Sequence, residues 1–326
     1  MENLNPHIEE LDPDVLYHLG LDSSIDLKAM FGNVKYVCMG GSADRAEDFL
    51  VKAAEQLELD LGEIEHGPLV DDLPKKIGRI MGTTAFRVLR ALGLHPERNR
   101  VLRKLIVQPI GKKERFSMFK LGPIIFVNHG MGMPSLSILL HEITKLLYHA
   151  GVEDPIFIRV GTSGGVGVEG GDVVVTIGAL NGELEPFREH IVLGERRRWP
   201  ADIDPELAQE ILSCAGRFHV VLGKTLGTDD FYEGQGRLDG ALNPGYTEAD
   251  KMIFLRKAHE AGVRNIEMES TEFVVFCRRA GIKCAIVCAA LLNRLNGDQV
   301  KATPVQLARF SDNAESVVLN FIKSRQ

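Results

Sequence analysis

Apolar runs and segments with apolar residues at helical spacing alternate along most of the chain. Residues 34–39 form a short β-prone run that stops at Gly40 and Gly41, and residues 43–57 then carry apolar side chains at helical spacing. Further strands are expected at 115–120, 123–128, 156–160, 172–177, 219–222, 265–268 and 283–289, the first two as a hairpin. Further helices are expected at 133–150, 205–214, 247–261, 270–280 and 304–322. This alternation, with continuous apolar strands, predicts an α/β fold around a largely buried sheet.

Composition narrows the class of protein. The 326 residues include 45 acidic and 38 basic side chains, for a formal net charge of −7. This is typical of a globular chain with enough apolar side chains for a buried core. The longest apolar run, 284–292, is far shorter than the about 18 residues that a membrane span needs, and the polar, acidic start does not resemble a secretory signal peptide. We therefore expect a cytosolic protein with no membrane span.

The cysteines do not indicate a disulfide framework or a thiolate zinc site. There are five, an odd number, and none forms a CxxC pair. Each lies in an apolar segment, so we expect reduced thiols in the core. They are Cys38, Cys214, Cys277, Cys284 and Cys288.

One segment differs in charge from the rest of the chain. Residues 73–104 hold nine Lys and Arg and one acid, Glu97, for a net charge of +8, so the remainder carries −15. On a helical wheel most of its apolar residues fall on one side and most basic residues on the other. The segment could bind a membrane surface or a partner, or it could be an added helix that covers the body of the protein with its basic face in water. We expect an inserted basic helical segment at about 71–108.

Two common motifs are present in part, but each lacks a neighbouring feature that its function requires. Gly165 to Gly170 satisfies GxGxxG, but a dinucleotide site needs a helix after the glycines, and residues 172–177 are expected to form a strand. His141 and Glu142 resemble the start of HExxH, but Lys145 replaces the second histidine, so one zinc ligand is missing. Neither a dinucleotide site nor a zinc site is expected.

Arginines beside glycines follow two of the expected strands. Gly40 and Gly41 precede Arg45, and Arg159 precedes Gly161 and Thr162. Backbone N–H groups of a glycine turn, together with a guanidinium, suit an oxyanion such as phosphate. Each motif alone is more commonly a surface ion pair, but the two together favour an oxyanion site.

Two further segments carry groups that suit a nucleoside. Gln235 and Arg237 lie in the segment 231–240, and a glutamine amide offers the donor and the acceptor that match a uracil-type ring. In the segment 266–270, Glu267 and Glu269 flank Met268 just before an expected helix. Acids in that position usually cap the helix, so this second segment is weak evidence alone.

Taken together, these segments resemble the uridine phosphorylases of the animal type, within the nucleoside phosphorylase superfamily. The matching segments span nearly the whole chain in the family's order: 14–18, 37–42, 128–135, 159–165, 230–241, 262–270 and 291–294. The resemblance implies a single domain over residues 1–326 with a nucleoside phosphorylase-like fold, in which helices flank a central mixed sheet. It also implies reversible conversion of uridine and phosphate to uracil and ribose 1-phosphate in pyrimidine salvage, a pentosyl transfer.

The resemblance assigns roles to residues of this sequence. It implies no metal and no organic cofactor, since phosphate is a co-substrate. It also implies a homodimer or higher homo-oligomer with shared active sites, in which Arg115 and His18 reach a neighbouring subunit's site. Phosphate would contact Gly41, Arg45, Arg115, Arg159 and Thr162; uracil would contact Gln235, Arg237 and Phe231; ribose would contact His18, Met268 and Glu269. The catalytic group would be Arg237, Gln235, Arg159 and Glu269.

The sequence departs from the family pattern at two places and leaves alternatives open. Ala43 stands where the family usually has proline, and the spacing between Asp60 and Glu114, which directly precedes Arg115, is longer than in the family. A related phosphorylase or nucleosidase for another base remains an alternative. So does a catalytically weak relative that binds a nucleoside or a protein partner through the basic segment. Nucleic-acid binding is disfavoured, because the body is acidic and the basic segment lacks interleaved aromatic residues.

Overall fold

The computed structural model describes residues 1–59, 110 and 115–326. The insertion expected at about 71–108 therefore lies outside the described residues. The chain divides into two compact units. The first unit comprises Met1–Asn3, Met131–Ser137 and Ile156–Gln326, and the second comprises Leu4–Gly130 and Ile138–Pro155. The expectation of a single domain stays a prediction.

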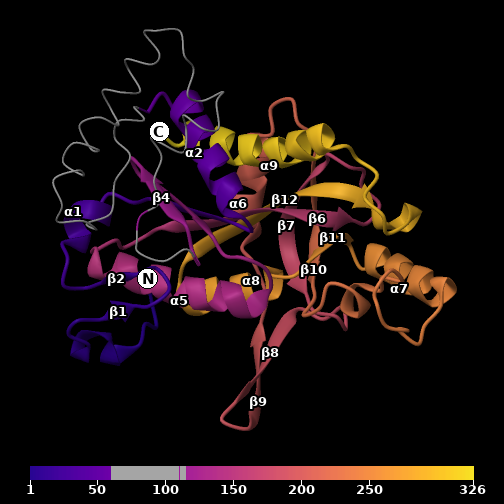
Figure 1. Ribbon diagram of the computed structural model, residues 1–326, viewed down its shortest axis with the longest axis horizontal. Coiled ribbons are helices and arrows are strands. Elements are labelled where there is room, and N and C mark those ends of the chain that lie inside the picture. The colour runs from indigo at the N-terminus through magenta and orange to yellow at the C-terminus, as the bar shows by residue number, and fades with distance from the viewer. Residues whose placement is uncertain (60–109, 111–114) are drawn as a thin grey trace. The chain divides into compact units, whose positions relative to one another are not determined.

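The first unit is built on a mixed sheet of five strands (Figure 1). In spatial order they are β11 (Val263–Glu267), β10 (Val220–Gly227), β7 (Val173–Leu180), β12 (Lys283–Asn293) and β6 (Ile156–Gly165). Three neighbouring pairs are parallel, and β12 and β7 are antiparallel. The end of β6 also pairs with β11, where Gly165 lies opposite Asn265, so the five strands close on themselves. The expected mixed sheet is confirmed.

Four helices of the first unit pack on this sheet. They are α6 (Pro205–Ser213), α7 (Glu248–Glu260), α8 (Ser270–Arg279) and α9 (Pro304–Ser324). Helices α6 and α9 contact each other and β12, α8 contacts β7, β10 and β12, and α7 contacts β11. Three of the helices begin at side chains that accept from their first turn, namely Asp204, Thr247 and Thr303.

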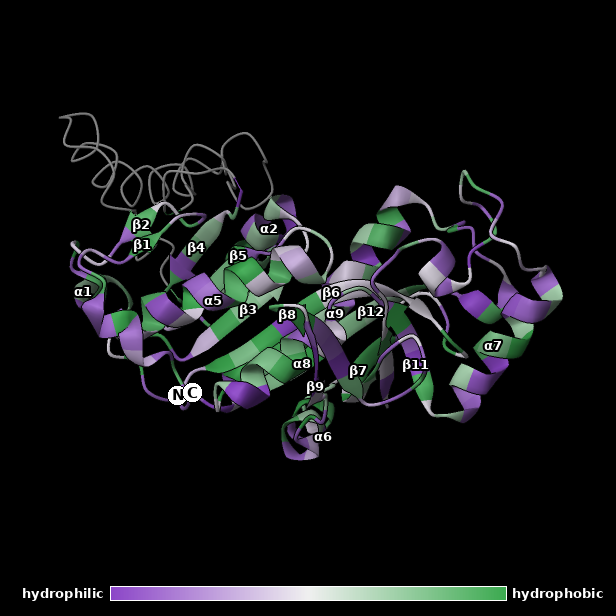
Figure 2. Cartoon of the chain, turned by 90° about the horizontal axis from the view of Figure 1, so that it is seen from below, coloured by the Kyte–Doolittle hydropathy of each residue, from purple (hydrophilic) through white to green (hydrophobic). Residues whose placement is uncertain are grey.

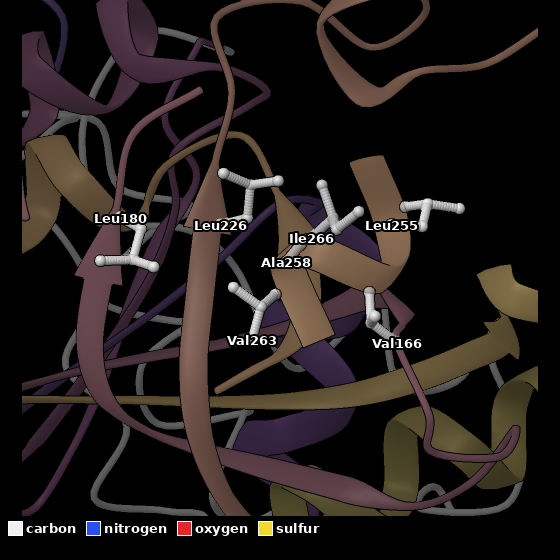
Figure 3. Close-up of a cluster of buried hydrophobic side chains, with 7 residues drawn as sticks. All are labelled: Val166, Leu180, Leu226, Leu255, Ala258, Val263 and Ile266. Atoms are coloured by element: carbon white, nitrogen blue, oxygen red, sulfur yellow. The ribbon is translucent and has the colours of Figure 1, made fainter. Parts of the chain in front are cut away.

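A compact apolar cluster joins α7 to β11 and the neighbouring strands β10 and β7. Figure 3 shows side chains from β7, β10, β11 and α7 converging with Val166. The cluster consists of Val166, Leu180, Leu226, Leu255, Ala258, Val263 and Ile266, each at most 3% exposed. Burial of this many apolar side chains fixes α7 in place, and that matters below because α7 carries a buried lysine next to the proposed base site.

The second unit contains a smaller sheet and the segment that holds His18. Strand β3 (Tyr36–Gly40) is parallel to β5 (Ile124–Asn128), which is antiparallel to β4 (Met118–Leu121), and α2 (Ala43–Gln56) packs on all three. Figure 2 shows β3 and β5 as mainly hydrophobic ribbons. The unit also holds the short helices η1 (Pro6–Glu10) and α1 (Leu27–Phe31) and the hairpin β1 (Val15–Leu16) and β2 (Leu21–Asp22). Helix α5 (Met133–His149) begins in the first unit and continues in the second.

Most of the expected elements are present, but one expectation was wrong and one hairpin was not expected. The expected glycine loop after residue 160 is instead part of β6, because Gly161 and Thr162 continue the ladder opposite Cys288 and Ala289 of β12. The hairpin of β8 (Phe187–Val192) and β9 (Glu195–Pro200) was not predicted from the sequence, because its strands are mostly polar and partly exposed. The strand expected after Gly165 to Gly170 is confirmed as β7, where a dinucleotide motif would have a helix.

Candidate active site

Arg159 is the centre of a buried cluster of charges in the first unit. It lies on β6 and is 3% exposed. Its Nη2 pairs with Glu267 Oε2 at 2.9 Å and also with Glu269, and its Nη1 donates to Cys288 Sγ at 3.0 Å. The partners come from the end of β11, the start of α8 and the middle of β12. A guanidinium this deep in the protein requires such partners, because an unpaired buried charge is costly.

Burial and mutual attraction shift the pKa values within this cluster. Burial raises the pKa of Glu267 to about 7, against the opposing effect of Arg159 and with a further contribution from Glu269. Burial acts to lower the pKa of Arg159, but the two carboxylates outweigh it and raise the pKa above its usual value. Burial also raises the pKa of the Cys288 thiol to about 11, so this thiol stays protonated at neutral pH and is not a nucleophile.

The two neighbouring glutamates have different surroundings. Glu267 accepts the backbone N–H groups of Glu269 at 2.9 Å and Ser270 at 2.8 Å, so its carboxylate caps the start of α8. Glu269, 5% exposed, accepts from the backbone N–H of Gly132 at 2.6 Å. Met268 lies near the same glycine, since its Cε is 3.9 Å from the place a Cβ on Gly132 would occupy. The cap expected from the sequence is therefore Glu267, and Glu269 has a separate position.

Gln235 and Arg237 form a second group in the first unit. Gln235 ends the short helix η4 (Glu233–Gln235) and is 4% exposed, yet its side-chain amide bonds none of the residues that the structure describes. Arg237 holds Asp239 through two hydrogen bonds, Nε to Oδ1 at 2.8 Å and Nη2 to Oδ2 at 2.6 Å. The hydrogen bond from Arg237 lowers the pKa of Asp239. The guanidinium of Arg237 lies 4.7 Å from the ring centre of Phe231, so two of the three predicted uracil ligands are in contact.

A buried ion-pair network holds the backbone of Gln235 in this group. Arg294, 1% exposed, begins the short helix η5 (Arg294–Asn296) and donates from Nη2 to the backbone oxygen of Gln235 at 2.8 Å. Its Nε donates to Asp298 Oδ1 at 2.9 Å, and Lys251 of α7 donates to Asp298 Oδ2 at 3.0 Å. Lys251 and Asp298 were not among the residues predicted from the sequence. Nothing local signals a pair that is 47 residues apart in sequence.

Glycines beside the arginines make room for guanidinium groups. A Cβ on Gly161 would lie 3.0 Å from Arg159 Nη1, because residues two apart on a strand share a face. In the second unit, a Cβ on Gly41 would lie 3.1 Å from Arg45 Nη2. Arg45 also donates from Nε to Ser42 Oγ at 3.2 Å, and Ser42 is the N-cap of α2. Gly41 and Arg45 therefore meet at a helix N-terminus, a place that favours anions.

The remaining predicted residues occupy different surroundings. His18 of the second unit bonds Glu142 through Nδ1 at 2.6 Å. Arg115 is exposed, and its backbone oxygen accepts from Asn128 Nδ2 at 3.5 Å. Thr162 is partly buried on β6. The roles expected for Arg115, Thr162 and the other site residues stay predictions.

A cavity of about 450 Å³ opens in the first unit next to the loop after η5. One of its lining residues, Gln299, donates to Asp239 at 2.5 Å, so the cavity wall is connected to the Arg237 group. Its lining is Glu169, Gly170, Leu291, Leu292, Asn293, Asn296, Gly297, Gln299, Lys301, Ala302, Gln306 and Phe310. Within the described residues, no three His, Cys, Asp or Glu side chains gather as a metal site would require.

Comparison with known proteins identifies the family. A family model described as the phosphorylase superfamily matches residues 76–323. The chain belongs to the phosphorylase superfamily.

Relatives within this superfamily agree with the resemblance seen in the sequence. Uridine phosphorylase 1 of Mus musculus is 42% identical over 323 residues, covering 98% of this chain and 91% of the relative. The crystal structure of uridine phosphorylase from Schistosoma mansoni in complex with thymidine is 34% identical, with a TM-score of 0.81 over 99% of this chain and 97% of that chain. The expected resemblance to uridine phosphorylases is confirmed, as is the nucleoside phosphorylase-like fold.

One phosphorylase relative differs in its activity. Inactive uridine phosphorylase B of Schistosoma mansoni is 32% identical over 329 residues, covering 98% of this chain and 95% of the relative. Family membership at this level of identity therefore includes an inactive protein, so the activity of this chain depends on which residues it has at its own site.

None of the helices in the described part of the chain is long and apolar enough to span a membrane.

Proposed function

We propose that this member of the phosphorylase superfamily is a uridine phosphorylase. In the reaction, the N-glycosidic bond of uridine breaks, an oxygen of inorganic phosphate bonds to C1′ of the ribose, and the bonding electrons leave with uracil, which takes up a proton. The observation that carries the proposal is that Gln235, two positions before Arg237 in the chain, is 4% exposed while its side-chain amide bonds no described residue.

The Gln235 amide is suited to a pyrimidine with adjacent carbonyl and N–H groups. Uracil offers a carbonyl oxygen and a ring N–H that match the two ends of one carboxamide. Arg237 is held by Asp239 through Nε and Nη2, which directs the remaining guanidinium edge to a second carbonyl. Phe231, over which Arg237 lies, offers an aromatic surface for the base.

The groups proposed for phosphate and ribose follow the family assignments. Phosphate is assigned to Gly41, Arg45, Arg159 and Thr162, and to Arg115 of a neighbouring subunit. Ribose is assigned to Glu269 and Met268, and to His18 of a neighbouring subunit. Support comes from the Arg45 guanidinium at the N-terminus of α2 and from the position of Met268 and Glu269 beside Gly132.

The proposed catalysis is electrostatic and needs no covalent intermediate with the protein. As the glycosidic bond breaks, positive charge develops on the ribose and negative charge on the uracil. Arg237 and Gln235 stabilise the departing base as donors, and the phosphate dianion faces the ribose as the nucleophile. Arg159 pairs with Glu269, so the group assigned to phosphate and the group assigned to ribose are coupled. Positioning of the two reactants contributes the rest of the rate increase.

The proposal includes a homo-oligomer, because His18 and Arg115 are assigned to a neighbouring subunit's site. It includes a cytosolic location and no metal or organic cofactor. We also propose that neither a nucleic acid nor a membrane is a partner. These parts rest on the resemblance and the composition of the chain.

Base selectivity is tested by comparing uridine, thymidine and inosine as substrates, each with saturating phosphate and each without. We expect efficient base release from uridine, a lower kcat/KM for inosine, and no release without phosphate. Inosine as the best substrate would overturn the pyrimidine assignment of Gln235 and Arg237. Binding of uridine without release of uracil would instead favour the second candidate, a catalytically inactive member of the family that binds a nucleoside; one relative, from Schistosoma mansoni, is described as inactive.

A further inference from the structure

A buried carboxylate on α5 holds both the backbone and the ring of His18. Glu142 is 8% exposed and belongs to the second unit, like His18. Its Oε2 accepts the backbone N–H groups of His18 and Leu19, each at 2.9 Å, and its Oε1 lies 2.6 Å from His18 Nδ1. Because three N–H donors converge on one carboxylate, the ring of His18 is fixed in position as well as its backbone.

These contacts determine which ring nitrogen carries the proton when His18 is neutral. Both carboxylate oxygens of Glu142 already accept backbone N–H groups, so Nδ1 is the donor to Oε1 and carries the hydrogen. Nε2 then has the free lone pair. The His18 side chain is 35% exposed, and Nε2 makes no hydrogen bond to any described residue. Neutral His18 therefore presents a hydrogen-bond acceptor on its open edge.

A second carboxylate anchors the same segment without contacting His18. Asp14, 2% exposed, pairs with Lys145 and lies 2.9 Å from His149 Nε2. The two α5 residues lie three and seven positions after Glu142, so all three occupy one face of the helix. The segment would thus keep an anchor on α5 if the Glu142 contacts were altered, and Asp14 offers a matched control.

We propose that Glu142 is a positioning residue that orients His18 so that Nε2 accepts a hydrogen bond from the 5′ hydroxyl of the nucleoside. This inference deepens the proposed function and rests on it, because the ribose contact of His18 is part of that proposal. The competing explanation is that Glu142 only anchors the segment 14–23. The two differ in one consequence, since only an orienting role makes the effect of Glu142 depend on the 5′ hydroxyl.

The test compares kcat/KM for uridine and for 5′-deoxyuridine, which lacks that hydroxyl, at saturating phosphate. In Glu142→Gln, the amide NH₂ can donate to Nδ1 and move the ring proton to Nε2, which turns the open edge from acceptor to donor. We expect the ratio of the two kcat/KM values to fall about tenfold, the value of one hydrogen bond. His18→Ala should lower the ratio similarly, and the double variant should show no further fall. Asp14→Asn should keep the wild-type ratio even if its stability is lower.

An equal loss for both substrates in Glu142→Gln would overturn the proposal, and so would a wild-type ratio of one. If the glutamine variant does not fold, Glu142→Asp replaces it. Its shorter side chain withdraws from Nδ1, so the ratio should again fall, and an unchanged ratio contradicts the proposal. Absence of base release from both substrates by the wild-type protein would instead contradict the proposed function, and this inference with it.

Discussion

At the scale of single residues, the buried carboxyl group of Glu267, next to the proposed site, has a raised pKa. Its pKa is raised to about 7, mainly by burial, while the ordinary value is 4.5. Between these two values the folded chain holds a proton at Glu267 that the unfolded chain has released. The folded state therefore binds more protons than the unfolded state in this window, and the contribution of Glu267 to stability falls as pH rises from about 4.5 to about 7.

We predict that this fall disappears when the titrating group is removed. The free energy of unfolding, measured by urea denaturation at several pH values, should decrease for the wild-type protein relative to Glu267→Gln by up to about 1.4 kcal/mol per pH unit inside the window. Above pH 7 the difference between the two proteins should be constant. A difference that is the same at pH 5 and pH 7 would show that Glu267 is charged throughout.

A second prediction concerns Arg237. Its loss should slow phosphorolysis of uridine about 10²–10³-fold, because a donor to the developing negative charge on uracil is removed. Arg217→Ala is a matched control, since Arg217 also lies over a phenylalanine ring, at 5.4 Å from Phe218, but is exposed and is not among the residues assigned to the site. Near-normal turnover of Arg237→Ala in a phosphate-dependent assay would contradict the assignment.

The sequence identified some of these residues and missed others for a physical reason. Gln235, Arg237 and Glu269 lie in short segments where the chemical groups follow one another, so their type and spacing point to a nucleoside. Lys251 and Asp298 are joined only by folding, since α7 and the loop after η5 are distant in sequence. Likewise, the pattern of two carboxylates could not show that Glu267 caps α8, because that depends on backbone N–H directions.

At the scale of elements, the junction of β3 and α2 joins helix stability to the proposed phosphate site. Ser42 caps α2, and its Oγ accepts from Arg45 through both the backbone N–H at 3.4 Å and Nε at 3.2 Å. The cap therefore also restrains the guanidinium that is assigned to phosphate. Loss of one hydroxyl affects both.

We predict that Ser42→Ala lowers the free energy of unfolding by about 1 kcal/mol and raises the KM for phosphate severalfold, with little change in the KM for uridine. The matched control is Thr303→Ala, which removes the corresponding cap of α9. That variant should lose similar stability and keep the KM for phosphate. If both variants change the KM for phosphate equally, the restraint of Arg45 by Ser42 does not contribute to phosphate binding.

Element lengths were predicted less well than element order. Apolar runs located β3, β7 and β12 because buried strands need continuous apolar side chains. The extension of β6 through Gly161 and Gly165 was missed because glycine has a low strand propensity, yet the ladder to β12 and β11 continues through it. The glycines there serve a different purpose, since Gly161 leaves space for Arg159.

At the scale of the whole molecule, the charge of the chain is uneven. The sequence places +8 on residues 73–104 and −15 on the remainder, and the basic segment lies outside the described residues. The residues proposed for uracil recognition, and most of those proposed for ribose, lie in the described part of the first unit, where the structure supports their grouping. The proposed activity therefore does not depend on a role for the basic segment.

The central claim is that this chain transfers ribose from uracil to phosphate. The most direct measurement is uracil release from uridine by the purified protein, followed with phosphate present and with phosphate absent. The account predicts uracil and ribose 1-phosphate in equal amounts with phosphate, and no uracil without it. Equal release in both conditions would identify a hydrolase, and no release in either would identify an inactive binder; both results would contradict the account.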